Sequence, residues 1–483
     1  MSKPIKIYEL KGQDLAKGYS YFSDFPFGGN MSEIVNFDPF LDYGYFTPSL
    51  GNAVTDVSLF STPRFLTTWN QSGTAKLYAH TNNKLYEVLD GTPWTTTDVS
   101  AQINVAYDVT GSAVFQNKYI YAQSSQTALY ANAFPVASGS NVAIFTSGGS
   151  NTEGYTPMCV APDKNLYFGH GDICRITDTT TTNNGTYYSL ESGIYCRDLA
   201  TDGKYLIAIA DNNTSHNKTT NGKSGTYRCQ VLFYDVNNGR STADYIYEFT
   251  DSYVSAVKVL DGKVYIFGKD NLWVCNSLTP PIAIFNFGAG STIQEPPLHF
   301  FQVHKRNNVI YWIGQTNQKI YAFGSKVAGA KKVFFQPFNT GTQPTCMTTS
   351  GDTVYIGSDS NGSMLYVLDS TQTKQSGTMS TSYFNLEQPY TFAFAKVIMK
   401  NKLATGGSVS LGMNSLAGEI TDYTTKVFST VGAKQSIIFN KASEAGNPPV
   451  ANFNDFNVLV VSNQAVSKVE IWAYPVENYD QTV

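Results

Sequence analysis

The sequence predicts an all-β protein, a seven-bladed β-propeller followed by a small β-sandwich of jelly-roll type. A phrase with two alternating apolar runs, such as "DGKVYIFGKDNLWV" from Asp261 to Val274, recurs about every 45 residues along most of the chain. The residues between these runs are mostly Asn, Thr, Ser and Gly, which favour turns. No segment has a sustained helical period of apolar residues, so we expect little helix.

Residues 1–52 are predicted to form an extended N-terminal segment, since stretches such as "FDPFLDYGYFTPSLG" are rich in aromatic residues, Gly and Pro. Such a segment cannot build a core alone, so we expect it to lie across a larger body, either this chain or a neighbouring one. The candidate inter-subunit residues within it are Phe40, Tyr43, Tyr45 and Phe46.

Residues 53–370 are predicted to form the propeller, because paired strands with a period of roughly 40–50 residues are typical of propeller blades. In "KVYIF" alternate side chains point to opposite faces and both sets are apolar, as expected for a blade between two others. We interpret the phrase as the inner hairpin of a blade, and unrelated hairpins in a large β-sandwich are the alternative. The first apolar residues of the runs are Leu77, Tyr119, Leu166, Tyr205, Val264, Val309 and Val354.

One interval in this repeat is longer because it contains a polar insertion at 211–228, "DNNTSHNKTTNGKSGTYR". The insertion interrupts a blade between strands and should project from the ring, where loops on a rigid scaffold commonly bind partners. A disordered loop without a partner is the alternative. Candidate loop or interface residues are Asn212, Asn213, His216 and Asn217, together with Trp94 in the turn-like stretch "DGTPWTTTD".

The C-terminal region does not continue the repeat. A polar Ser/Thr/Gln-rich linker is predicted at 371–380, and residues 381–483 then contain several short strand-like runs, among them "GSVSLGM" and "KVEIWAYPV". Many short strands in about 100 residues are typical of a β-sandwich or jelly roll.

Composition limits the classes of function. The chain of 483 residues has a net charge of −4 and only 14% charged residues, so it carries no excess of positive charge for nucleic acid or anionic membrane. The N-terminus has no apolar run of a secretory signal, and no stretch approaches the roughly 20 apolar residues of a membrane helix. We therefore expect synthesis in a cytoplasm, no membrane insertion, and six cysteines that are mostly buried free thiols.

No group of residues predicts catalysis, a metal site or a cofactor. In "HGD", Asp172 could orient His170, but a turn histidine is the simpler interpretation. His299 and His304 would lie on opposite faces of one strand, which disfavours a shared metal. The turn at Asn361-Gly362 has the oxygen ligands of a calcium loop only in part and fits a tight β-turn. Sialidases resemble this chain in architecture only, because their repeated Ser-x-Asp-x-Gly-x-Thr-Trp turns are missing here.

Three stretches together resemble structural proteins of tailed-bacteriophage virions, of the tail hub or nozzle type. The opening "NFDPFLDYGYFTPSLG" is similar to the N-terminal pattern of many such proteins, although the arginines usual in it are absent. The blade array follows, and the ending "TSYFNLEQPYTFAFAKVIMKN" with "VEIWAYP" is similar to their closing β-sandwich. The resemblance implies several identical copies around a tail axis, through which DNA leaves.

The leading hypothesis is thus a non-enzymatic structural component of a phage tail, a ring bordering the DNA exit channel, located in the virion. Its expected partners are other copies of itself, neighbouring tail or portal-adaptor proteins, and DNA that passes without specific binding. The second hypothesis is a receptor-binding tail protein whose loops recognise a bacterial surface glycan. The third is a glycan-cleaving propeller enzyme, whose paired carboxylates would come from different blades.

Overall fold

The computed structural model is an all-β molecule, and it divides into two compact units that are described separately below. No helix of the described residues is long and apolar enough to cross a membrane. The described residues run from Lys3 to Val476 with gaps at 12–30, 36–51, 59–61, 72–73, 82–83, 90–94, 104–108, 124–127, 134–135, 138, 147–154, 181–185, 214–226, 288–294, 315–318, 326–327, 330–331, 340–342, 351–352, 360–363, 369–375, 382, 402–405, 428–435 and 441–451.

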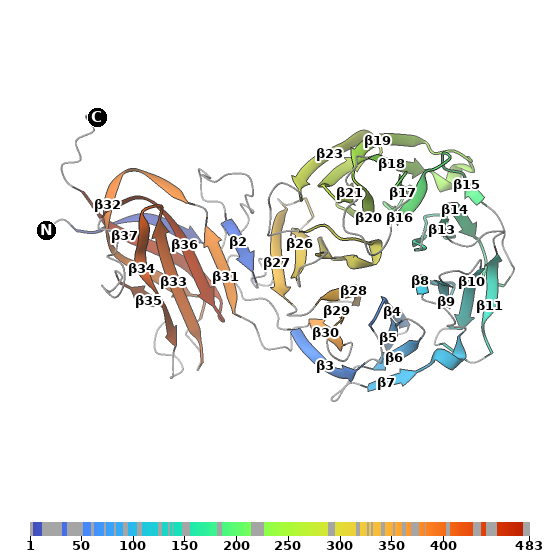
Figure 1. The fold of residues 1–483 in the computed structure, drawn as a ribbon, viewed down its shortest axis with the longest axis horizontal. Coiled ribbons are helices and arrows are strands. Elements are labelled where there is room, and N and C mark those ends of the chain that lie inside the picture. Colours follow the sequence, from blue (N-terminus) through green and yellow to red (C-terminus); the bar gives the residue numbers. More distant parts are fainter. Residues whose placement is uncertain are drawn as a thin grey trace. The chain divides into compact units, whose positions relative to one another are not determined.

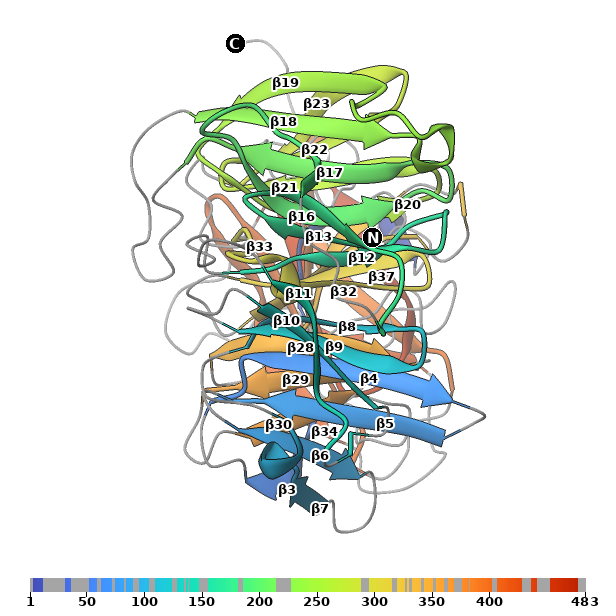
Figure 2. The same ribbon diagram turned by 90° about the vertical axis from the view of Figure 1, so that its right-hand side faces the viewer.

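The first unit, Ala53–Lys319 with Thr340–Leu368, is a β-propeller with six four-stranded antiparallel blades (Figure 1). In Figure 2 the strands of these blades run across the thickness of the ring. The blades are β4 (Phe65–Gln71), β5 (Thr74–His80), β6 (Leu85–Leu89) and β7 (Thr95–Asp98); β8 (Val109–Phe115), β9 (Lys118–Gln123), β10 (Ala128–Ala133) and β11 (Val142–Thr146); β12 (Met158–Val160), β13 (Leu166–His170), β14 (Asp172–Ile176) and β15 (Thr186–Tyr188); β16 (Tyr195–Thr201), β17 (Leu206–Asp211), β18 (Tyr227–Tyr234) and β19 (Tyr245–Asp251); β20 (Val254–Leu260), β21 (Lys263–Gly268), β22 (Asn271–Asn276) and β23 (Thr279–Asn286); and β28 (Pro344–Ser350), β29 (Thr353–Ser358), β30 (Met364–Leu368) and β3 (Asn52–Ser58).

The last of these blades joins the two ends of the propeller sequence. Its outermost strand, β3, comes from the N-terminal side of the propeller and lies next to β30, more than 300 residues later in the chain. The two ends of the propeller sequence therefore cannot separate without breaking this sheet. The unit also contains the hairpin of β24 (Val303–Arg306) and β25 (Val309–Ile313).

The repeated phrase forms the two middle strands of a blade, so its interpretation as the inner hairpin is wrong. "DGKVYIFGKDNLWV" folds into β21 and β22, whereas β20 lies nearer the centre of the ring (Figure 1). Five consecutive residues of β21, Val264 to Gly268, are buried. A middle strand is covered on both faces by neighbouring blades, and this burial explains why its apolar pattern is the most legible in the sequence.

Side-chain hydrogen bonds link the innermost strands of neighbouring blades. The hydroxyls of Thr67 on β4 and Ser112 on β8 are 2.6 Å apart, and Thr68 Oγ1 on β4 donates to the carbonyl of Thr349 on β28 at 2.8 Å. Small hydroxyl-bearing side chains on β4 and β8 thus let these innermost strands approach their neighbours closely.

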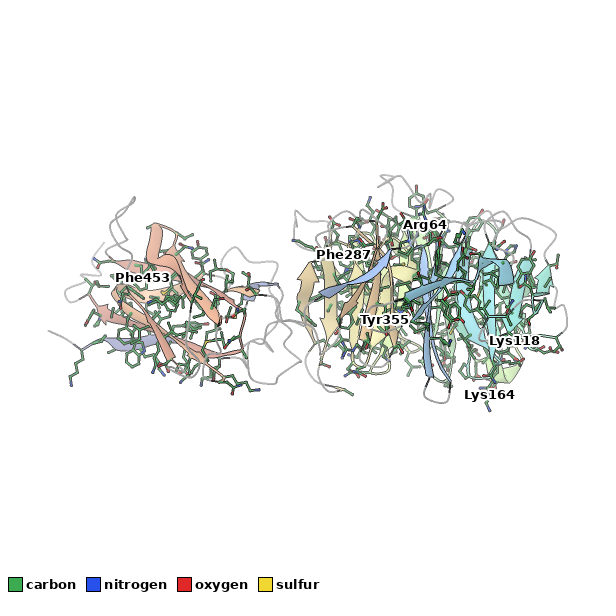
Figure 3. The ribbon with its side chains drawn as sticks, turned by 90° about the horizontal axis from the view of Figure 1, so that it is seen from below. Arg64, Lys118, Lys164, Phe287, Tyr355 and Phe453 are labelled. Carbon is green, nitrogen blue, oxygen red and sulfur yellow. The ribbon has the colours of Figure 1, made fainter. Side chains whose placement is uncertain are left out.

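Opposite faces of the ring carry different connections. Figure 3 shows Lys164, in the turn between β12 and β13, on the opposite face from Arg64, which directly precedes β4. The predicted insertion 211–228 connects β17 to β18, as expected for a segment that interrupts a blade.

The second unit comprises Met1–Asn52, Ile320–Asn339 and Asp369–Val483. Its strands pair mostly antiparallel, and alternate residues of β36 are buried, as expected for strands with one covered face. Most of the stretch "TSYFNLEQPYTFAFAKVIMKN" forms a single long strand, β32. The strands are β26 (Lys319–Gly324), β27 (Val333–Asn339), β31 (Gly377–Thr381), β32 (Phe384–Met399), β33 (Ser408–Ser415), β34 (Gly418–Val427), β35 (Ser436–Phe439), β36 (Phe453–Ser462) and β37 (Val466–Pro475).

Two strands of the N-terminal segment 1–52 are incorporated in this unit. β1 (Ile5–Lys11) pairs antiparallel with β37, and β2 (Met31–Val35) pairs antiparallel with β31 and parallel with β27. β31 occupies the end of the predicted linker 371–380, so the linker prediction is wrong there. Its Gly, Ser and Thr residues resemble a loop in sequence, yet they alternate between buried and half-buried as in a strand.

Candidate functional site

Buried charges gather at one seam of the propeller, between the blade β16–β19 and the blade β20–β23. Three aspartates of the first blade, Asp198, Asp211 and Asp251, are each at most 3% exposed, and each bonds to the second blade. We call this group the aspartate seam. Buried carboxylates are rare unless they are paired or fully hydrogen-bonded, so their partners decide what this group can do.

Asp211, at the end of β17, accepts hydrogen bonds from its own blade and from the next one. Its Oδ1 accepts from Arg197 Nε at 2.8 Å and from Asn213 N at 3.1 Å, and its Oδ2 accepts from Val254 N on β20 at 3.0 Å. The Arg197 guanidinium also donates to the Asn213 carbonyl at 2.7 Å. The side chains of Arg197 and Asp211 are 6% and 0% exposed, so the two form a buried ion pair within one blade. The bond from Val254 N to Asp211 then ties this blade to the next one.

Asp198 makes the second link. Its Oδ2 accepts from Val257 N at 2.9 Å and from Lys258 Nζ at 3.1 Å, both on β20. Burial raises the pKa of the Asp198 carboxyl, and Lys258 and the backbone donors oppose this rise. Burial and then the charge of Lys258 lower the pKa of nearby His304 to about 3, so this imidazole is neutral at neutral pH.

Asp251 makes the third link. Its carboxylate accepts from the backbone N of Asp270 at 3.0 Å, from that of Asn271 at 3.2 Å, and from Trp273 Nε1 at 2.9 Å. Burial raises the pKa of Asp251, and these donors counteract the effect. Gly268 lies so close that a Cβ there would be 2.2 Å from Asp251 Oδ2, and this contact explains the glycine.

Two cavities lie along the seam. One, of about 20 Å³, is lined by Tyr155, Arg197, Ser255 and His299 among others, and has room for a single water molecule. The other is a shallow groove of about 470 Å³ where β16 and β20 end, with Asp202, Lys258, Asp261 and Lys305 among its lining residues. The groove holds charges of both signs, and one of its cations, Lys258, is already paired with Asp198.

The histidines singled out in the sequence have structural surroundings. His170 and Asp172 flank the turn at Gly171, but the Asp172 carboxylate accepts from Leu190 N at 2.8 Å and from Thr186 Oγ1 at 3.3 Å. His299 is the N-cap of the short 3-10 helix η4 (Phe300–Gln302), not part of a strand, and only His304 lies on β24. The expectation of one strand carrying both was therefore wrong, because the helix intervenes.

The predicted loop and interface residues are only partly described. Asn212 is exposed and its side chain accepts from Arg228 N at 3.0 Å, whereas Asn213 is 4% exposed and donates to the Ser252 carbonyl. Asn213 therefore belongs to the seam, contrary to its prediction as a loop contact. Trp94, His216, Asn217, Phe40, Tyr43, Tyr45 and Phe46 lie outside the described residues.

All six cysteines are free, and all but the partly exposed Cys159 are buried. Within the described ranges there is no group of three or more His, Cys, Asp or Glu side chains that could hold a metal ion. Sequence reasoning missed the whole aspartate seam, since its members lie far apart along the chain and belong to no recognisable motif.

We expect the protein to lose stability in acid because of His80, which is fully buried on β5 next to the Tyr119 hydroxyl. Burial lowers the pKa of His80 from 6.5 to about 3, so the folded state keeps this imidazole neutral while the unfolded state protonates below about pH 6.5. This contribution to stability is present above pH 6.5 and is lost as the pH falls towards 3, by about 1.4 kcal/mol per pH unit.

Urea unfolding of the wild type and of His80→Gln at pH 7.5, 5.5 and 4.5 measures this dependence. The variant should be less stable at pH 7.5 and should lose less of its unfolding free energy between pH 7.5 and 4.5. Equal slopes for the two proteins would contradict the assignment.

No family model matches the chain, and no curated protein matches it. A structure of virginiamycin B lyase from Staphylococcus aureus with quinupristin is 12% identical, covers 66% of this chain and all of that chain, and has a TM-score of 0.46. A streptogramin B lyase structure is 11% identical over 66% of this chain and 98% of that chain, with a TM-score of 0.44. The strand topology and the seam thus define the class as a β-propeller protein whose buried charges join blades.

Proposed function

We propose that this protein is a non-catalytic structural component of a bacteriophage tail, a nozzle- or hub-like ring that borders the DNA exit channel. It is made in the host cytoplasm and acts in the virion by assembly of identical copies. Its neighbours are other copies and further tail or portal-adaptor proteins, and DNA passes without specific binding. The resemblance of both chain ends to tail proteins suggests the class, and the geometry below supports it.

One observation carries the proposal: strands from the N-terminal segment complete sheets formed much later in the chain. β1 pairs with β37, the last strand; β2 pairs with β31; and β3 is the outer strand of the closing propeller blade. A chain interlocked in this way resists unravelling from either end, which suits a part that must keep its shape while DNA passes under pressure.

The aspartate seam supports a role without catalysis. Each of its carboxylates accepts hydrogen bonds from backbone N–H groups of the next blade, and two of them are also paired with Arg197 or Lys258. Carboxylates engaged in this way stabilise a ring and are poor general bases, because proton transfer would break the bonds that hold the blades together.

An exposed apolar surface supports assembly. The turn and edge strand around β23, the outermost strand of its blade, expose Leu278 (76%), Ile282 (62%) and Ile284 (40%). Clustered exposed apolar residues on a soluble protein commonly mark a surface that a partner covers. We assign this surface, the β23 rim, to contact with a neighbouring copy.

The finer architecture is also a proposal. The hairpin β24–β25 repeats the first two strands of the other blades, and the sequence phrase continues in "KIYAFG" of β26, which supports a seventh blade. Three observations support a two-sheet C-terminal sandwich. One group of strands forms around β32, which pairs with β35 and β37, and another forms around β36, which pairs with β31 and β33. Burial alternates along β36.

Cryo-electron microscopy of the phage particles that contain this chain tests the function. We expect a closed ring of copies around the DNA channel. Copies at the tip of a fibre with their loops outward, together with saccharide binding by the isolated protein, would instead identify a receptor-binding protein.

The variant Ile282→Lys tests the β23 rim in purified protein. A charge at a site that a neighbour covers should reduce assembly at least about tenfold, as measured by light scattering of purified protein, while the melting temperature stays within about 1 °C because the residue is exposed in the free chain. Thr250→Lys, at an exposed position on β19, is the matched control and should assemble normally. Normal assembly of Ile282→Lys would contradict the role of this rim.

A further inference from the structure

The junction between the first and the last strand of the second unit is a complete strand-docking site. β1 lies at the edge of its sheet and pairs antiparallel with β37 from Ile5–Ala473 to Lys11–Lys468. Leu10 on β1 is fully buried. The ring of Tyr8 lies 4.2 Å from that of Phe384 and 5.6 Å from that of Phe456 between centroids. Main-chain pairing with side-chain anchors is the recognition mode by which an edge strand binds a separate peptide.

Charges set the register of this junction. Glu9 on β1 lies 2.6 Å from Lys6 and 3.5 Å from Lys468, and Lys468 lies 2.7 Å from Glu470 on the same strand. Hydrogen bonding to Lys6 lowers the pKa of Glu9, so the carboxylate stays charged. A shift of β1 by one residue would move Leu10 out of its buried position and would separate the two pairs that cross between the strands, Glu9 with Lys468 and Lys6 with Glu470. These contacts therefore favour a single register.

A long stretch of sequence separates β1 from the next described strand. Among the described strands β1 pairs only with β37, and residues 12–30 separate it from β2, which is held by β31 and β27. That connection can span up to about 60 Å when extended. A connection of this length would allow β1 to pair with β37 of any copy that lies within that distance.

We propose that β1 is exchanged between copies in the assembled protein, so that β1 of each chain pairs with β37 of the next copy. This inference rests on the assembly of identical copies in the proposed function. The contacts of β1 are the same in both arrangements, so exchange costs little, and copies held side by side present β37 at an effective concentration of the order of millimolar. Around a closed ring every β37 edge is covered, and each subunit is tied to its neighbour by seven residues of strand.

Disulfide trapping with full-length chains tests the exchange. Lys11 and Lys468 face each other in the register, and cysteines at such a position can form a disulfide under mild oxidation. Chains carrying only Lys11→Cys are co-expressed with chains carrying only Lys468→Cys, assembled, oxidised and separated on a non-reducing gel. Exchange predicts covalent pairs of chains in the proportion given by random mixing. When both cysteines are in one chain, exchange should link many chains, and the gel should show covalent dimers, trimers and larger species.

The control pairs Lys11→Cys with Asn385→Cys, an exposed residue on β32, a strand that does not pair with β1, and it should give no covalent pairs. Light scattering of the same samples separates the two ideas. If the protein forms a ring but the disulfide of the double variant forms only within single chains, so that it migrates as a monomer on the gel, the exchange is wrong and the ring stands. Chains that stay monomeric in solution and in the particle would overturn both.

Discussion

Replacing Asp211 by alanine is expected to destabilise the propeller by about 3–5 kcal/mol, because the change leaves the Arg197 guanidinium buried without its carboxylate. Val254 N on β20 and Asn213 N would lose their acceptor at the same time. For a unit of this size the loss should lower the melting temperature by about 10 °C, measured by calorimetry or by circular dichroism during heating.

The matched control is Asp202→Ala, an exposed aspartate whose side chain accepts from the backbone N of Lys204 and Tyr205 in a turn. It should cost about 1 kcal/mol. A second variant, Arg197→Met with Asp211→Leu, removes both charges, and it should be more stable than Asp211→Ala alone because no unpaired charge remains. Similar melting temperatures for Asp211→Ala and Asp202→Ala would show that the buried pair does not hold the seam.

Gly111→Ala is expected to destabilise the protein by about 3 kcal/mol or more, since an added methyl group has no space. A Cβ at Gly111, on the innermost strand β8, would lie 1.9 Å from the carbonyl oxygen of Thr156. That neighbour is backbone, and it is held to β8 by the bond from Thr156 N to the Thr110 carbonyl at 2.9 Å. Relief would require two innermost segments to move apart.

Ser112→Ala, the next residue on the same strand, is the control for Gly111→Ala. It removes the hydrogen bond to Thr67 but adds no atoms, so its expected cost is about 1 kcal/mol. Urea unfolding of both variants, followed by intrinsic fluorescence, compares the two. A Gly111→Ala protein as stable as Ser112→Ala would contradict the close approach of β8 to Thr156.

The middle strands of the blades could be predicted from sequence because their signal is continuous along the chain. Both faces of β21 are buried, so Val264 to Phe267 form an unbroken apolar run between turn residues. Two of the innermost strands have a weaker signal. β4 and β8 carry Thr, Ser and Gly where they approach their neighbours, and these residue types resemble a loop. For this reason the repeated phrase was recognised, but its place in the blade was misjudged.

The candidate site could not be predicted because its residues come from different blades. Arg197 and Asp211 are on neighbouring strands of one blade, yet Val254, whose N–H donates to Asp211, begins the next blade. Asn213 looked like part of a polar insertion, and its burial depends on the contact with Ser252. Nothing in the local pattern separates these aspartates from the many exposed ones in turns.

The sequence by itself determined the all-β class, the repeated strand pairs and the position of the insertion between β17 and β18, because alternation and turn chemistry involve residues close together in the chain. Only the tertiary structure decided which aspartates are buried together, that β3 closes a blade and that β1 covers the edge of β37. These features join residues up to several hundred positions apart, and such pairings depend on the ring and the sheets being formed, which no local pattern records.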